Sequence, residues 1–404
     1  MTSRPGVDVK YAFNPNDASA AKDFARMAVI RREKPVCRPA DNIVLVTRYA
    51  DAVEVFRDSK GFSSVGDMRA PGIVVPTEES FLGELDAPLH PKIRRMLHRT
   101  FTIAKAQESD AFTRRTVQRR LAVMSSVGKG DLMADLGIPV PGSVAADLMG
   151  FPEALHDPLM SWCDQLLHSS WPATGRTERG EGIVGGFPEL ARCIDEQIAI
   201  RAKDASRDDL LASMVRSRGE DGWQIGAHHT RTLVVNMLAG SLSASYMIGN
   251  LLYRLLTDAS FEAALRGDDA LIDRAVEESL RYEAPVAFMW RTARADSSIG
   301  GVPVFAGEHI MCHITAANRD EAAYPDGESF RLDRIDPPEH LAFGSGPHLC
   351  LGNHLTRLIG RIVLEETLEL MAKARVELAP GFAWQCVNHL QEYGPEHLPV
   401  RIAR

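Results

Sequence analysis

The sequence predicts a mainly α-helical protein with a small β-sheet region. Apolar residues recur with helical spacing through most of residues 108–282. Short β-rich pieces are confined to residues 42–49 and 298–317. Because the helical segments are long and the strand-like ones are short and few, we expect helices to form most of the fold.

The N-terminal third predicts one strand, one helix and one long loop. Residues 42–49 are rich in β-branched side chains and predict a strand. A helix is expected from Asp51 to Phe56. Residues 65–82 are punctuated by Gly and Pro but are also apolar, which is typical of a long structured loop with a function.

The remaining chain predicts helices interrupted by irregular segments. Residues 171–187 break the helical pattern and predict a flexible crossing. Residues 298–317 contain Gly300-Gly301 and Ala306-Gly307 between β-rich pieces, which predicts a hairpin. Residues 325–340 show almost no periodicity.

Composition indicates an ordinary globular protein of 404 residues, with 45% hydrophobic and 25% charged residues. We expect a single domain over residues 1–404. The net charge of −8 argues against nucleic-acid binding. The six cysteines lack the spacing of a zinc site or redox pair, and no signal-like or membrane-spanning apolar stretch is apparent, which indicates a cytoplasmic protein without a membrane anchor.

The most informative segment is residues 343–352, in which Cys350 is approached by glycines and followed by a helical pattern. A cysteine binds metal as a thiolate, and unpaired N–H groups at a helix start favour that anion. Gly344 and Gly346 permit backbone angles closed to other residues, and Gly352 lets a flat ligand approach. A buried structural cysteine is the alternative, but the glycine framework favours a metal ligand.

This segment, Phe-Gly-x-Gly-x-His-x-Cys-x-Gly, resembles the haem-ligating loop of the cytochrome P450 family. The resemblance implies the cytochrome P450 fold along nearly the whole chain, in the form of the soluble bacterial members. It also implies heme b as cofactor, with Cys350 as the axial ligand of the iron and His348 at the edge of the haem. Three further sets of residues extend the resemblance.

The first set is Glu278, Arg281 and Arg334. Glu278 and Arg281 share one face of a predicted helix, and by themselves would be read as a surface ion pair. The family carries a Glu-x-x-Arg pair completed by a later arginine, a position that Arg334 matches. The resemblance implies a buried charged cluster that holds the loop of Cys350 in place.

The second set matches family residues that contact the haem propionates, namely His90, Arg94 and Arg291. Two carboxylates on a buried macrocycle need charge-assisted donors, and the planar fork of arginine suits them. Taken singly, each of these residues is more often a surface salt-bridge partner.

The third set lies on a helix at about residues 230–256, which the resemblance places across the haem. Ala239 and Gly240 match the family and would leave room for oxygen. Leu242 and Ser243 stand where the family usually has an acid and a threonine. Either Ser243 only packs the helix, or it donates to oxygen while protons arrive through ordered water, Ser241, Ser245 or a substrate hydroxyl.

The resemblance implies a haem-thiolate monooxygenase that takes electrons from a separate ferredoxin and ferredoxin reductase. A basic docking patch is one reading of several arginines, and ordinary solvated charge is the other: Arg94, Arg95, Arg99, Arg357 and Arg361. The substrate is expected to be a hydrophobic small molecule of secondary metabolism, held by mainly apolar residues: Leu238, Leu242, Val286, Phe288, Met289 and Tyr393. Peroxide-driven or ring-forming chemistry and a non-catalytic partner protein are the alternatives.

Overall fold

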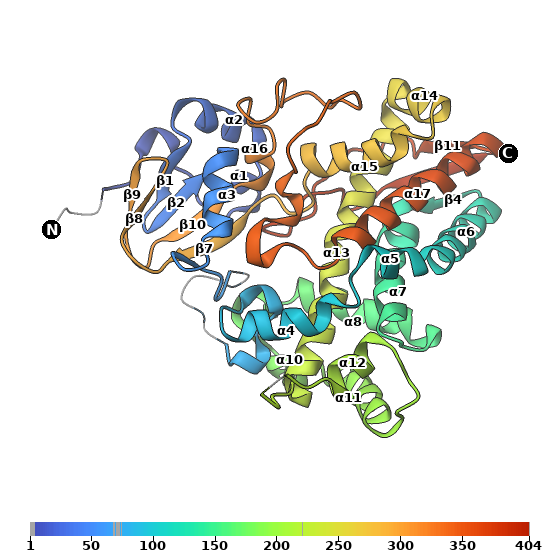
Figure 1. The fold of residues 1–404 in the computed structure, drawn as a ribbon. Helices are drawn as coiled ribbons and strands as arrows, with labels where there is room; N and C mark the ends of the chain where they lie inside the picture. The colour runs from blue at the N-terminus through green and yellow to red at the C-terminus, as the bar shows by residue number, and fades with distance from the viewer. Residues whose placement is uncertain (1–4, 68, 70–72, 74, 220, 404) are drawn as a thin grey trace.

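The computed structural model describes residues 5–67, 69, 73, 75–219 and 221–403, and it confirms the mainly helical fold (Figure 1). The four longest helices are α6 (Asp110–Val127), α11 (Pro188–Lys203), α13 (Ala227–Thr257) and α17 (Asn353–Lys373). The other helices are α1 (Ala18–Ala21), α2 (Phe24–Glu33), α3 (Tyr49–Arg57), α4 (Leu89–His98), α5 (Ile103–Glu108), α7 (Pro139–Leu148), α8 (His156–His168), α9 (Trp171–Thr174), α10 (Gly182–Gly186), α12 (Leu210–Arg216), α14 (Ala259–Gly267), α15 (Leu271–Tyr282) and α16 (Ile314–Ala317).

Helix α13 runs through the middle of the molecule, and its neighbours include α7, α8, α11, α15 and α17 (Figure 1). It is buried on most sides because apolar and small residues occupy nearly its whole circumference. In the described part of the chain, α13 is the one helix that is long and apolar enough to cross a membrane. However, 78% of its most apolar stretch is buried inside the protein. A core helix has the same properties, so α13 is no evidence for an anchor.

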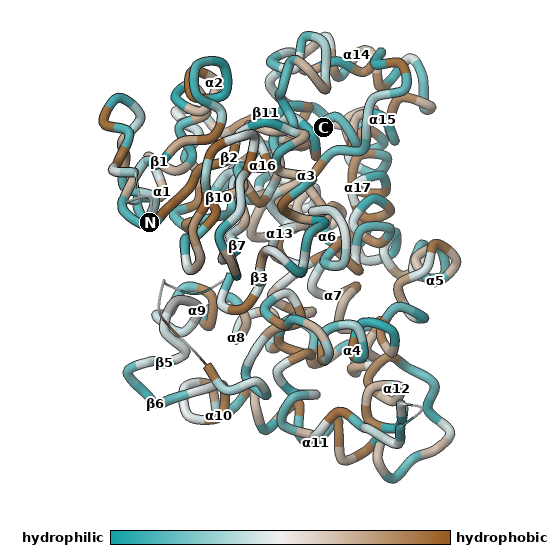
Figure 2. Tube along the Cα trace, turned by 60° about the vertical axis from the view of Figure 1, so that its left-hand side comes forward, coloured by the Kyte–Doolittle hydropathy of each residue, from teal (hydrophilic) through white to brown (hydrophobic). Residues whose placement is uncertain are grey.

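The main sheet contains five strands in the order β1-β2-β10-β7-β3. Only the β2–β10 pairing is parallel. Hydrophobic residues concentrate on the central strands (Figure 2), because β2 is buried on both faces. The strands are β1 (Val36–Ala40), β2 (Ile43–Val46), β3 (Phe62–Ser63), β7 (Met289–Ala293) and β10 (His309–Cys312).

Smaller sheets complete the fold. A three-stranded sheet has the order β11-β12-β4, and two hairpins stand apart from it. Their strands are β4 (Lys129–Asp131), β11 (Arg375–Leu378), β12 (Pro399–Ala403), β5 (Arg176–Thr177) with β6 (Gly180–Glu181), and β8 (Ser297–Ile299) with β9 (Val302–Val304).

The structure corrects several boundaries expected from the sequence. The strand expected at 42–49 ends at Val46, and the following helix begins at Tyr49 instead of Asp51. The segment 298–317 holds the expected hairpin, but its last strand leaves the hairpin and pairs with β2 and β7. The segment 171–187 forms two short helices and a hairpin instead of a flexible crossing. These differences arise because the strands pair with segments far away in the chain, and the local sequence does not indicate that pairing.

Candidate haem site

The loop that carries Cys350 is held by its own backbone. The Cys350 N–H donates to the Phe343 carbonyl at 2.9 Å. Gly344 and Gly346 have φ values of 71° and 72°, in the left-handed region that favours glycine. A Cβ at Gly346 would also lie 2.8 Å from the carbonyl oxygen of Phe56 in α3. The two glycines therefore let the loop turn tightly against α3 and present Cys350 to the interior.

Cys350 opens onto an internal cavity of about 260 Å³ between α4, α13 and α17. The residue is solvent-accessible because it faces this cavity, although protein surrounds the loop. Gly240 is the accessible position on the α13 wall, and a Cβ there would meet no atom within 4 Å. Other lining residues are His90, Arg94, Asn236, Met237, Ser241, Ala244 and His348.

The charge state of Cys350 differs from the simple expectation for a cysteine at a helix start. Helix α17 begins at Asn353, three residues after Cys350, so the sulfur lies outside the first turn. Burial raises the pKa of the Cys350 thiol, while the Gly352 N–H, Arg94 and Arg357 oppose that shift. In the chain without metal, desolvation therefore outweighs the groups that favour the thiolate.

Two stacked imidazoles lie at one wall of the cavity. The rings of His90 and His348 are 3.9 Å apart between centroids and inclined by 27°. Burial, with the charge of Arg94, lowers the pKa of His90 to about 4. Burial, with His90 and neighbouring arginines, lowers the pKa of His348 to about 3. His90 Nε2 and His348 Nδ1 are buried and have no hydrogen-bond partner in the described part of the chain.

The two arginines predicted beside the haem are held differently. Arg94 Nη2 donates to the Leu349 carbonyl at 2.5 Å, which ties α4 to the Cys350 loop. Arg291, on β7, donates from Nη1 to Asp67 Oδ2 at 3.0 Å and to the Trp290 carbonyl at 2.6 Å. Burial, opposed by Arg291, raises the pKa of Asp67 to about 8. No motif in the sequence pointed to this acidic partner.

These residues fit a haem. Cys350 supplies a sulfur at the cavity wall, and Gly240 leaves open space on the α13 side. His90 and His348 each have a buried ring nitrogen without a hydrogen-bond partner among the described residues, and both rings lie near arginines. Buried polar groups normally have partners, so this wall, with its two imidazoles and Arg94, suits the carboxylates of a haem.

On α13 the cavity face is not the one that the substrate prediction assumed. Leu238, Ala239 and Leu242 are buried in an apolar cluster and are absent from the cavity lining. Each residue advances 100° around a helix, so the wall around Gly240 recurs at Asn236 and Ala244 instead. Leu242 was expected to make the cavity wall less polar, but its side chain lies in the apolar core and does not reach the cavity.

In the described part of the chain, two of the serines of α13 donate hydrogen bonds to the backbone of their own helix, and Ser243 does not. Ser241 Oγ donates to the Leu238 carbonyl at 2.6 Å, and Ser245 Oγ donates to the Ser241 carbonyl at 3.3 Å. Ser243 is half-buried and shows no such bond among the described residues. Ser241 and Ser245 therefore donate to their own helix, and of these two serines only Ser241 lines the cavity.

The other predicted substrate residues lie beside the main sheet. Phe288 is fully buried and packs at 5.8 Å from Trp290 between ring centroids. Tyr393 packs against Phe24 at 4.6 Å. Val286 and Met289 are partly buried near the same strands. None of the four lines the cavity of Cys350, because β7 and its neighbours turn these side chains into their own core.

The residues predicted to stabilise the loop form one buried cluster. Arg281 donates to Glu278 through two bonds of 2.7 Å, and Arg334 Nε donates to Glu278 at 3.1 Å. Arg281 also binds the carbonyls of Asn318 and Gly327, both at 2.8 Å. The cluster thereby ties α15 to the irregular segment before the Cys350 loop.

Sequence reasoning missed a second carboxylate on α15. Glu277 accepts from Arg357 Nε at 2.6 Å and lies 3.3 Å from His340 Nε2. Burial disfavours its ionisation, but the nearby His340 and the ion pair with Arg357 outweigh burial and lower its pKa to about 2. The guanidinium of Arg357 also lies 4.6 Å from the Phe343 ring centroid. Glu277 precedes Glu278, and that adjacent pair of acids was the available signal.

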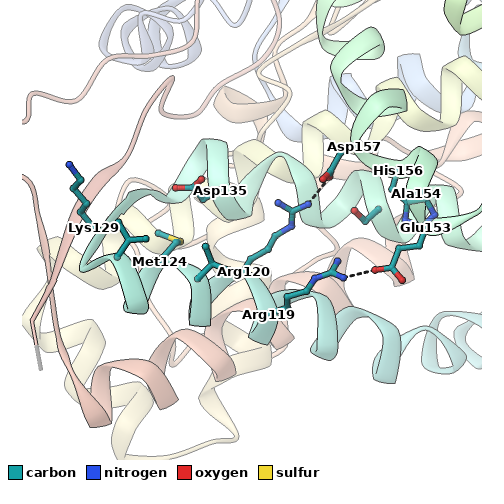
Figure 3. Close-up of a pocket in the computed structure, with 12 residues that line it drawn as sticks. Arg119, Arg120, Met124, Lys129, Asp135, Glu153, Ala154, His156 and Asp157 are labelled. Carbon is teal, nitrogen blue, oxygen red and sulfur yellow. Dashed lines mark hydrogen bonds and ion pairs between the residues drawn. The ribbon is translucent and has the colours of Figure 1, made fainter.

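A larger surface groove lies elsewhere, at α6, α7 and α8 (Figure 3). Four of its charged residues form two ion pairs: Arg119 with Glu153 at 2.5 Å, and Arg120 with Asp157 at 2.7 Å. Neither Cys350 nor the two stacked histidines line it. The groove is therefore separate from the cavity of Cys350.

A cysteine that shares a cavity with an arginine and two imidazoles fits a haem-thiolate protein. The comparisons agree. The family model for cytochrome P450 matches residues 190–370. The chain is 31% identical to the cytochrome P450 monooxygenase PikC of Streptomyces venezuelae, over 95% of this chain and 92% of that one. It is 27% identical to a steroid C26-monooxygenase of Mycolicibacterium smegmatis, over 99% and 97% of the two chains.

Solved structures give the same result. A mutant of P450 EryK in complex with erythromycin B matches with a TM-score of 0.83 and 26% identity, over 96% of this chain and 98% of that one. The chain belongs to the cytochrome P450 family. It is an oxidoreductase of the monooxygenase type, and its cofactor is a haem whose iron is ligated by cysteine.

Proposed function

We propose that Cys350 is the axial ligand of the haem iron and that the enzyme hydroxylates a hydrophobic small molecule of macrolide or steroid size. The observation that carries this is the shared cavity of Cys350 and Gly240 between α4, α13 and α17. Two relatives support the substrate class, since one is a steroid C26-monooxygenase and another an erythromycin C-12 hydroxylase. We expect the enzyme to act in the cytoplasm.

A reduced carbon monoxide difference spectrum tests the ligand, and spin-shift titration with macrolides and steroids tests the substrate class. We expect a band at about 450 nm, and a band at about 420 nm in freshly purified protein would contradict a thiolate ligand. Spin shifts with small polar compounds alone would contradict the proposed substrate class.

When bound, the haem supplies the activation of oxygen. We propose that His90, Arg94, Arg291 and His348 hold its carboxylates through charge-assisted and neutral hydrogen bonds. Gly240 leaves space on the α13 side, whereas Ala239 lies in the apolar core. We propose that Ser243, which is half-buried near the edge of the cavity wall, turns its hydroxyl toward that space when oxygen is bound, while Leu242, packed in the core, carries no proton.

Replacing Ser243 with alanine is expected to divert electrons from product into hydrogen peroxide. Losing one hydrogen bond of about 1 kcal/mol corresponds to about a fivefold fall in product formed per electron. The measurement is peroxide and product per electron consumed. Ser245→Ala is the matched control, because its hydroxyl is bound to the helix backbone. If the Ser243 variant formed as much product per electron as the wild type, its hydroxyl would have no role in the reaction.

We also propose that a small acidic ferredoxin, reduced by its own reductase, docks on α4 at Arg95 and Arg99. Both arginines are exposed, and among the described residues neither takes part in an ion pair. Arg357 pairs with Glu277 and Arg361 with Glu365, so their charges are partly neutralised. Arg94 binds the Cys350 loop instead of solvent. The proposed docking patch therefore contains two of the five arginines that the sequence suggested.

Reversing both charges, Arg95→Glu with Arg99→Glu, is expected to raise the KM for a ferredoxin about tenfold at low salt, because charge complementarity sets the encounter rate. The effect should shrink as salt rises. The control makes the same charge change at Lys373 and Arg375, which are 69% and 76% exposed near the end of α17. An equal effect in both variants would leave only net charge as the cause and would refute the docking site.

A further inference from the structure

Asp67 and Arg291 form a buried, hydrogen-bonded pair beside the proposed haem carboxylate site, and the pair is ionic when Asp67 is ionised. Their side chains are 2% and 5% exposed, and the N–O distance is 3.0 Å. Asp67 Oδ1 is buried and lacks a hydrogen-bond partner among the described residues. Asp67 lies in the segment between β3 and α4, and Arg291 lies on β7, so the pair joins the loop to the sheet.

Arg291 is constrained on one side and available on the other. Its Nη1 is used by Asp67 and the Trp290 carbonyl, and its guanidinium lies 5.1 Å from the Phe56 ring centroid. Within the described residues, no acceptor is recorded for Nε and Nη2. A planar guanidinium that is held through one nitrogen can donate from its other two nitrogens to a second carboxylate.

We propose that Asp67 is a positioning residue that orients Arg291 toward the haem carboxylates, and that the charge on Asp67 is coupled to the redox state of the haem. The proposal rests on the proposed role of Arg291. It extends that role to a residue that does not itself contact the haem.

The charges around Asp67 set the direction of the coupling. Arg291 stabilises its carboxylate, whereas Glu84 and Asp86 disfavour it, and burial raises its pKa to about 8. Asp67 therefore changes charge in mildly alkaline solution.

An ionised Asp67 disfavours the addition of an electron to a nearby haem. When the redox partner delivers one electron, Asp67 takes up a fraction of a proton from solvent, and charge is balanced. Above the pKa of Asp67 in the oxidised protein, the midpoint potential should become more negative as pH rises. At lower pH, where Asp67 is already protonated, the potential should be flat.

The test measures the midpoint potential of the holoenzyme from about pH 6 to about pH 10, with the rate of haem transfer to an acceptor protein. Asp67→Asn keeps an acceptor for Arg291 but cannot ionise. We expect it to lose the fall in potential while releasing haem at the wild-type rate. Asp67→Ala should release haem about tenfold faster, because Arg291 loses its partner.

Glu308→Gln is the matched control. Glu308 pairs with Arg38 at 3.0 Å with the same exposures, 5% for the arginine and 2% for the acid. It should keep the wild-type dependence of potential on pH. A wild-type pH dependence in Asp67→Asn would overturn the coupling, and wild-type haem release in Asp67→Ala would overturn the positioning role.

The premise is tested separately by Arg291→Ala. Fast haem release in this variant supports Arg291 at the haem carboxylates, whatever the Asp67 variants show. Unchanged release would overturn the proposed role of Arg291, and with it the role of Asp67.

Discussion

Replacing Cys350 with alanine is expected to abolish the band at about 450 nm of the reduced, carbon monoxide-bound protein and to reduce product formation to background. The reason is that no other described cysteine lines the same cavity. The measurement is the difference spectrum together with product formed per unit of protein. A Cys350→His variant separates loss of haem from loss of thiolate, since imidazole should move the band to about 420 nm.

Cys386→Ala is the matched control for this prediction. Cys386 is also a free cysteine and is partly exposed, but it lies in the segment that follows β11. Its variant should keep the wild-type spectrum and turnover. A Cys350→Ala protein that still absorbs at about 450 nm would show that another sulfur binds the iron.

Replacing Arg281 with alanine is expected to lower the free energy of unfolding by about 3–5 kcal/mol, because it leaves the carboxylate of Glu278 buried without its main partner. Arg281 and Glu278 are 2% and 5% exposed, and Arg281 also holds three backbone carbonyls, those of Asn318, Gly327 and Ser329. The measurement is urea unfolding of the holoenzyme, followed by haem absorbance and circular dichroism.

The control for this variant is Arg331→Ala. Arg331 is 41% exposed and pairs with Asp326 and Asp333 at 3.0 Å, so the loss should be at most about 1 kcal/mol. Because Arg281 holds the segment before the Cys350 loop, its variant should also lose haem at a lower urea concentration than it unfolds. Equal stabilities of the two variants would show that the buried cluster does not stabilise the fold.

The glycines and cysteine of the 343–352 loop were the strongest prediction, since they act on neighbouring backbone. Positive φ at Gly344 and Gly346 is a local requirement, and it is visible in the residue types alone. The helical segments were visible for a similar reason, because amphipathic spacing repeats within a few turns. The pairing of the last strand within residues 298–317 was not visible, since its partner Ile43–Val46 is far away in the chain.

Substrate residues were the weakest prediction. Leu242 lies on α13 and Phe288 lies next to β7, but both side chains are in the core. An apolar residue type is equally suited to a cavity wall and to a core, so it does not distinguish the two. The direction of a side chain on α13 depends on how the helix is rotated against its neighbours. That rotation is set by the packing of the whole helix bundle.

Residues that are close together in the chain were enough to identify the loop of Cys350, the family and the mainly helical fold. The folded structure was needed to show which face of α13 meets the cavity, that Glu277 neutralises Arg357, and that Asp67 holds Arg291. The last pair is 224 residues apart. Burial and charge pairing are properties of the folded surroundings, so a linear sequence cannot reveal which distant partner a charged residue finds.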